Sequence, residues 1–213
     1  AKGWTGEQDW VGFIPYAGLP RLFNPRSGQI VTANNKVVGP RYPYFITRDW
    51  SPPYRAQRIE ALLGESDSHD SESFAAIQAD TVSLAAEYLL PRLIALVSPG
   101  SEAAQDALIR LAAWDHVMAA ERAEPLIYMA WLREMMRVLF ADELGATFRY
   151  YFSIRENAIF DALKPGATWC DDTATAAEED CAAAAGTALD RALDYLAQRY
   201  GDNMDSWAWG EAH

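Results

Sequence analysis

Apolar and polar positions follow helical spacing most clearly near the C-terminal end of the chain. One face carries the apolar side chains Leu189, Ala192, Leu193, Leu196, Ala197 and Tyr200, whereas Asp190, Arg191, Asp194 and Gln198 lie opposite. Gly201 follows this pattern in the position at which a glycine commonly ends a helix. The sequence therefore predicts an amphipathic helix that ends at about residue 200.

Several earlier segments also have the pattern of helices. Ser51-Pro52-Pro53 supplies a capping hydroxyl and a proline for a helix start. Glu124-Pro125 opens a largely apolar segment, which is expected to be the central helix of a bundle. Pro91 is expected to bend a long helix. The predicted helices cover residues 52–64, 74–96, 101–118, 124–139 and 148–163, with an acidic loop at 65–72.

The first fifty residues have a different pattern. Residues 11–15 and 29–33 read as short strands, and Asn24 to Gly28 read as the turn that joins them. The chain is therefore expected to divide at about residue 51. Residues 1–50 would form a β-hairpin and loop segment, and residues 51–213 a helical subdomain. The predicted fold class is mainly α with a short N-terminal β-hairpin region.

Composition and charge exclude some classes of partner. The chain has 213 residues, of which 50% are apolar and 12% aromatic, so it can bury a hydrophobic core. Its net charge of -12 argues against nucleic acid, because phosphate binding needs clustered Lys and Arg. No apolar run approaches the roughly 20 residues of a membrane span. Ala1-Lys2-Gly3-Trp4 does not open a signal peptide.

The two cysteines, Cys170 and Cys181, bracket the loop before the last predicted helix. This spacing suits a disulfide that pins the loop to the helix, and a disulfide would indicate an oxidising compartment such as the periplasm. The alternative is two unpaired thiols. A zinc site is disfavoured, because two cysteines without a nearby histidine do not supply four ligands.

The segment 27–35 holds the candidate catalytic residues. It ends in two side-chain amides, those of Asn34 and Asn35, and Arg55 follows about twenty residues later. Such amides and a cation can stabilise negative charge that develops on a substrate oxygen. A turn at Asn34-Asn35 is the alternative, and the residues by themselves favour it. For Arg55 the alternative is an ion pair on a helix surface. None of the three histidines belongs to a recognisable catalytic arrangement.

A set of motifs resembles, in the same order, the penicillin acylase (penicillin amidase) family. The resemblance covers nearly the whole chain and matches an internal piece of the family's β-chain. It is carried by residues Trp10 to Pro15, Asn24 to Gly28, Thr32 to Asn35, Arg55 to Leu63, Ile77 to Asp80, Leu111 to Asp115, Arg199 to Asp202 and Trp207 to Gly210.

The resemblance implies a segment of an N-terminal-nucleophile hydrolase, with residues 1–50 in the core sheet of an αββα parent. Such enzymes are exported as precursors to the periplasm and cleave themselves into two chains. The new N-terminal serine of the β-chain then attacks an amide carbonyl, with its own α-amine as the base. Residue 1 here is alanine. We therefore expect the nucleophile to lie upstream and this chain to be inert alone.

The resemblance implies roles for two residues, from their positions in the family motifs. Asn34 matches the asparagine whose side-chain amide donates to the oxyanion, and Arg55 matches an arginine that supports the site. Some relatives bind calcium through an acid between these two positions, but residues 37–47 contain none. We therefore expect no metal ligand or cofactor in this chain, although the full-length parent can bind calcium through residues upstream.

The leading interpretation is thus a piece of a periplasmic amidase that hydrolyses an N-acyl substrate: a β-lactam, an acyl-homoserine lactone or another small amide. Its partners would be the remainder of the β-chain and the α-chain. The alternative is a helical binding or interaction module without catalysis. The two differ in whether the reading frame continues upstream into a cleavage junction.

Overall fold

The structure, a computed structural model, describes residues 2–7 and 9–212. The chain divides into two compact units, Ala1–Ile77 and Gln78–His213. Within the described part of the chain, every helix is too short or too polar to cross a bilayer.

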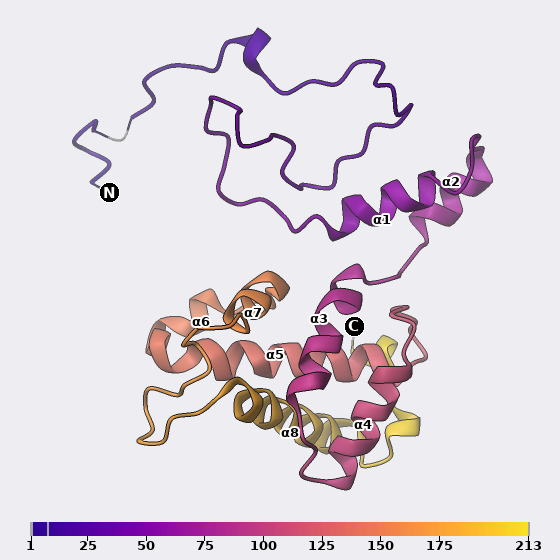
Figure 1. The fold of residues 1–213 in the computed structure, drawn as a ribbon, viewed down its shortest axis with the longest axis vertical. Helices are drawn as coiled ribbons and strands as arrows, with labels where there is room; N and C mark the ends of the chain where they lie inside the picture. The colour runs from indigo at the N-terminus through magenta and orange to yellow at the C-terminus, as the bar shows by residue number, and fades with distance from the viewer. Residues whose placement is uncertain (1, 8, 213) are drawn as a thin grey trace. The chain divides into compact units, whose positions relative to one another are not determined.

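The second unit is built around α5 (Ala123–Leu144), which lies at its centre in Figure 1. Ile127, Trp131, Leu132, Met135 and Leu139 on this helix have no solvent exposure. These side chains share one broad face of the helix. Leu126, Met136 and Phe140 on its other sides are also buried, so α5 is covered on most sides. The prediction of a central apolar helix is confirmed.

The last long helix, α8 (Cys181–Tyr200), packs along α5. Ala185, Ala188 and Ala192 are fully buried, and their short side chains allow the two helices to approach closely. The indole N–H of Trp131 donates to the carbonyl of Ala185 at 3.0 Å, which satisfies the polar atom of a fully buried side chain. The predicted amphipathic helix and its end at Gly201 are confirmed.

Shorter helices complete the second unit. Ser83 caps the helix that begins at Leu84, and Ser101 caps the helix that begins at Glu102. Their hydroxyls accept the N–H groups of Ala86 and Ala104. These helices are α3 (Leu84–Leu96), which contains Pro91, α4 (Glu102–Ala113), η2 (Gly145–Thr147), α6 (Phe148–Tyr151), α7 (Glu156–Ala162), η3 (Met204–Ser206) and η4 (Trp209–Ala212).

Three predicted helices differ from the observed ones. The segment 74–96 is broken, because α2 (Ser71–Gln78) ends before Val82 forms an antiparallel bridge with Val117. The segment 101–118 ends at residue 113 for the same reason, since Val117 belongs to that bridge. The segment 148–163 is divided into α6 and α7 by residues 152–155.

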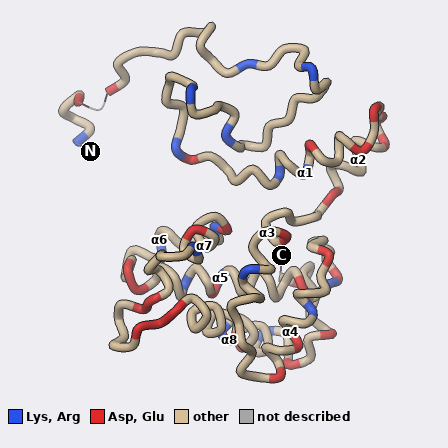
Figure 2. The backbone as a smooth tube through the Cα atoms, in the orientation of Figure 1, with Lys and Arg blue, Asp and Glu red and all other residues tan. Residues whose placement is uncertain are grey.

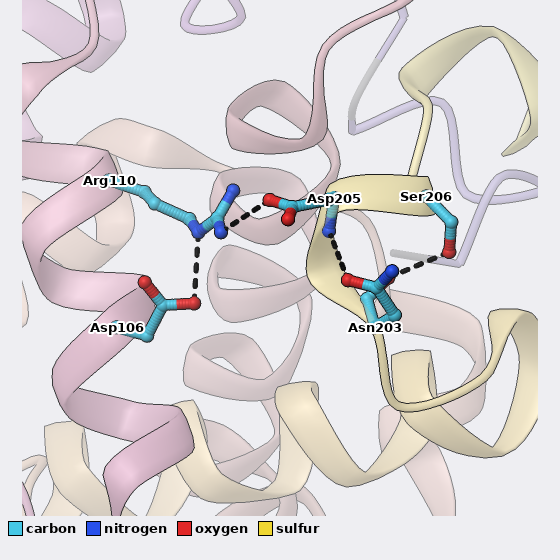
Figure 3. A network of polar contacts seen from close by, with 5 residues as sticks. All are labelled: Asp106, Arg110, Asn203, Asp205 and Ser206. Carbon is cyan, nitrogen blue, oxygen red and sulfur yellow. Dashed lines mark hydrogen bonds and ion pairs between the residues drawn. The ribbon is translucent and has the colours of Figure 1, made fainter.

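An ionic network joins α4 to η3 (Figure 3). Arg110 on α4 contacts Asp106 one turn earlier at 3.0 Å and Asp205 on η3 at 2.6 Å. The side-chain oxygen of Asn203 accepts the N–H of Asp205 at 3.0 Å, and the Ser206 hydroxyl donates to the Asn203 carbonyl at 2.7 Å. The contacts fix the chain that follows α8 against α4.

The first unit contains η1 (Tyr16–Gly18), α1 (Tyr54–Leu63) and most of α2. The predicted β-hairpin is wrong, because the described residues of this unit form no strand. Trp10, Val11 and Phe13 are instead exposed by 88%, 106% and 90%. An isolated two-stranded hairpin is marginal in water, since its apolar face lacks a layer to cover it. Asn24 to Gly28 do form a turn, in which Gly28 donates to Pro25.

The two units do not coincide with the predicted division at residue 51. Helical structure begins at α1, close to that point, but α1 belongs to the first unit. The boundary between the units falls inside α2, after Ile77. The point at which helices begin therefore differs from the boundary between the two compact units.

Candidate active-site segment

Asn34 and Arg55 are brought together in the first unit. Nη2 of Arg55 donates to the side-chain oxygen of Asn34 at 2.9 Å and to the backbone carbonyl of Ala33 at 2.8 Å. Both side chains are exposed, whereas Ala33 is 8% exposed. A guanidinium in this position therefore holds both the side chain and the backbone at Asn34.

The backbone around Asn34 is fixed by the next residue. The side-chain oxygen of Asn35 accepts the N–H of Ala33 at 3.0 Å, which forms a local turn. Asn34 has a φ of 61°, in the left-handed region that asparagine tolerates better than most residues. The turn expected from the residues is therefore present at Asn34.

Ser51 closes the segment from the other side. Its N–H donates to the Asn34 carbonyl at 2.9 Å, within a parallel bridge between Asn35 and Ser51. Ser51 is therefore not the helix cap that the sequence indicated. Pro53 occupies the N-cap position of α1, which makes no side-chain capping bond, and Arg55 follows in the first turn of the helix. The bridge and the start of α1 together place Arg55 within hydrogen-bond distance of Asn34.

The contact with Arg55 determines which way the Asn34 amide faces. A guanidinium has five N–H donors and no acceptor, so it can be met only by the oxygen of the amide. The amide nitrogen of Asn34 must then point away from Arg55. Asn34 itself is exposed, so it lies on the surface of the unit. The arrangement provides a neutral, oriented hydrogen-bond donor.

The described residues supply no nucleophile and base beside Asn34. None of their serine, threonine or cysteine side chains is hydrogen-bonded to a histidine. His69 lies 3.0 Å from the Leu63 carbonyl, and His116 packs edge-on against Trp114 with ring centroids 5.4 Å apart. Both histidines therefore have structural contacts, and His213 lies outside the described residues.

No group of three or more His, Cys, Asp or Glu residues in the described part of the chain is arranged to hold a metal ion. The expectation of calcium in the full-length parent stays a prediction.

The predicted disulfide between Cys170 and Cys181 is confirmed, with Cα atoms 4.9 Å apart. It ties the loop before α8 to the first residue of that helix. The loop is also held by side chains, because Asp171 accepts the N–H of Glu179 at 3.0 Å and Glu179 accepts the N–H of Asp172 at 3.1 Å. The disulfide lies in the second unit, and its role is structural.

The penicillin amidase family model matches residues 1–213. The chain belongs to this family. It is 35% identical to the penicillin acylase 2 proenzyme of Pseudomonas sp. (strain SE83), an alignment that covers 99% of this chain and 27% of that protein. It is 32% identical to the acyl-homoserine lactone acylase QuiP of Pseudomonas aeruginosa, over 100% of this chain and 28% of that protein.

A solved structure gives the same fold relationship. The chain is similar to a thermostable penicillin G acylase from Alcaligenes faecalis, with a TM-score of 0.68 and 20% sequence identity, over 95% of this chain and 42% of that one. The 213 residues thus span less than a third of the length of the two curated relatives. The family expected from the sequence motifs is confirmed.

Proposed function

We propose that this chain is a segment of the β-chain of an amide hydrolase, in which Asn34 donates to the oxyanion of the tetrahedral intermediate. The observation that carries the proposal is the 2.9 Å hydrogen bond from Arg55 to the Asn34 side-chain oxygen. It orients the amide before any substrate arrives, so no reorganisation is needed when charge develops. A preorganised donor of this kind stabilises the transition state more than the ground state.

Asn34 would act when a nucleophile adds to the amide carbonyl of the substrate. The carbonyl π electrons then move onto oxygen, and the Asn34 N–H shares its hydrogen with that oxygen. When the intermediate collapses, the electron pair on oxygen would re-form the C=O bond, the C–N bond would break, and the amine would leave with the proton that the nucleophile gave up. The hydrogen bond from Asn34 then weakens again. Arg55 is a positioning residue in this account, because its hydrogen bonds are to Ala33 and Asn34.

The nucleophile would come from outside these residues, as the N-terminal serine of the processed β-chain, so this segment would be inert alone. The exposed Trp10, Val11 and Phe13 support contact with further polypeptide, because three exposed large apolar side chains within four residues are unfavourable in water. We propose the remainder of the β-chain and the α-chain as these partners.

The substrate proposed is a small N-acyl amide. Two relatives are named as a penicillin acylase and as an acyl-homoserine lactone acylase. The disulfide supports location in an oxidising compartment, which we propose to be the periplasm. No observation specifically favours a non-catalytic interaction module over this function.

The test is Asn34→Ala in the processed parent enzyme, assayed against a panel of phenylacetyl, phenoxyacetyl and long-chain acyl amides. Turnover of the best substrate should fall by at least tenfold, with the two chains still cleaved and folded. Near-normal turnover would contradict the role of Asn34. A reading frame that lacks an upstream cleavage junction would contradict the enzyme assignment itself.

A further inference from the structure

Asn34 is held in a backbone conformation that its own side chain does not enforce. Its φ of 61° lies in the left-handed region, which asparagine tolerates, although it also adopts the right-handed and extended regions that other residues prefer. A change of φ at this residue would move the Asn34 amide relative to Arg55. Contacts from neighbouring residues are therefore needed to hold the backbone to which the amide is attached.

Asn35 supplies one of these contacts. Its side-chain oxygen accepts the N–H of Ala33 at 3.0 Å, so a single hydrogen bond joins the residues on either side of Asn34. Asn35 is half-buried, and Ala33 is 8% exposed. If the Asn35 oxygen were removed, the Ala33 N–H would lose its partner in a place with little access to water.

The other hydrogen bonds at this turn come from later parts of the chain. The Ala33 carbonyl accepts from Nη2 of Arg55 at 2.8 Å. The Asn34 carbonyl accepts the N–H of Ser51 at 2.9 Å, beside the parallel bridge between Asn35 and Ser51. The peptide groups on both sides of Asn34 are thus held, and the Asn35 side chain closes the turn from within, independently of Arg55.

We infer that Asn35 is a positioning residue for catalysis, whose side-chain oxygen holds Asn34 in the conformation from which its amide meets Arg55 and the oxyanion. The inference rests on the proposed function, because the gain in turnover passes through Asn34. Arg55 fixes the orientation of the amide, whereas Asn35 fixes the backbone that carries it. Both matter, because a catalytic group displaced by about 1 Å can lose roughly 10²-fold in rate.

The test is the steady-state kinetics of the processed parent with Asn35→Ala and with Asn35→Asp. In Asn35→Ala the Ala33 N–H loses its acceptor, so kcat should fall about tenfold, on the scale of one buried donor left unpaired. KM should change by less than twofold, because the ground-state contacts of the substrate are unaffected.

Asn35→Asp keeps an oxygen in the same place and should retain at least a third of kcat. Its added negative charge meets no acidic residue in the surrounding sequence, because residues 10–48 contain no Asp or Glu. Figure 2 shows only Lys and Arg coloured along this stretch. Asn35→Gln moves the amide by one methylene group and should lower kcat as Asn35→Ala does, which keeps the test decisive if Asn35→Ala does not fold.

Asn203→Ala is the matched control. The Asn203 side-chain oxygen accepts the N–H of Asp205 at 3.0 Å, also two residues away, but in the second unit. This variant loses the same kind of hydrogen bond and should keep kcat within twofold of the unchanged enzyme. A crystal structure of the Asn35→Ala parent gives a readout besides activity, and it should show the bond between Arg55 and Asn34 broken.

The double variant Asn34→Ala/Asn35→Ala should turn over as slowly as Asn34→Ala alone. An unchanged kcat in Asn35→Ala, an equal loss in Asn35→Asp or Asn203→Ala, or a further loss in the double variant would overturn the inference. Near-normal turnover in Asn34→Ala would contradict the oxyanion role and this inference with it. A large loss in Asn34→Ala beside an unchanged kcat in Asn35→Ala would contradict the positioning role alone.

Discussion

Arg55 donates from Nη2 to the side-chain oxygen of Asn34 at 2.9 Å, across 21 residues of sequence. The bond assigns the two ends of the amide, because only the oxygen can accept from a guanidinium. Asn34 stays in its turn, and its amide N–H groups face away from Arg55. The predictions for this segment follow from that relationship.

Replacing Arg55 should impair catalysis through Asn34. In the processed parent, Arg55→Met removes the donor that orients the amide, so kcat should fall about tenfold, on the scale of one hydrogen bond to a charged group. Arg55→Lys should retain part of the activity, because an ammonium can still donate to the Asn34 oxygen. Arg26→Met, in the turn before the segment, is the control and should leave kcat unchanged.

The two side chains should also show non-additive effects. If Arg55 acts by holding Asn34, then Arg55→Met should have little further effect on kcat in an Asn34→Ala background. Fully additive losses in this double-mutant cycle, measured by steady-state kinetics, would show that Arg55 acts on the reaction independently of Asn34.

How far the sequence predicts this structure depends on whether the determining contacts are local. The apolar pattern of α5 and the Gly201 end of α8 are encoded within each helix, and both were predicted. The break after α2 was missed because Val82 pairs with Val117, which lies far along the chain. The segment 11–15 has a strand pattern but no neighbouring strand in the described structure, so its pattern alone was misleading.

The candidate site was predictable in part. Asn34 and Arg55 were identified by their positions in a set of family motifs, and their contact was not evident from spacing alone. A pocket of about 400 Å³ that is lined by residues of the segment 36–50 was not predicted, because its lining comes from a loop without periodicity.

Opening the disulfide should destabilise the second unit. The disulfide joins two cysteines that are 11 residues apart in sequence. Its reduction opens this loop in the unfolded chain and should lower the free energy of unfolding by about 3 kcal/mol, as estimated from loop entropy. Urea unfolding with and without reductant measures this difference. The Cys170→Ala/Cys181→Ala variant should match the reduced chain and be insensitive to reductant. An unchanged midpoint after complete reduction would contradict the structural role of the bond.

The stability of the chain should depend on pH through Glu143. Desolvation raises the pKa of Glu143 to about 7, and its hydrogen bond and charge repulsion with Asp142 act in the same direction. The unfolded chain releases this proton near pH 4.3. Between these values the folded state binds more protons, so stability should fall as pH rises from about 5 to 7 and level off above that.

Glu143→Gln should flatten this part of the profile and raise Tm at pH 8 relative to the unchanged chain. Thermal unfolding followed by circular dichroism at pH 5, 6, 7 and 8 measures it. Glu178→Gln, in the exposed part of the neighbouring loop, is the matched control and should keep the original slope. If Tm depended on pH with the same slope in both variants, Glu143 would not be the source of the pH dependence.

The most direct test of the central claim compares two ligands of the processed parent: a boronate transition-state analogue and the corresponding ground-state amide. If Asn34 donates to the oxyanion, Asn34→Ala should weaken binding of the analogue by roughly 10²-fold, the scale of one oxyanion-hole donor, and change affinity for the ground-state amide by less than threefold. Equal effects on both ligands, or no effect on the analogue, would contradict the account.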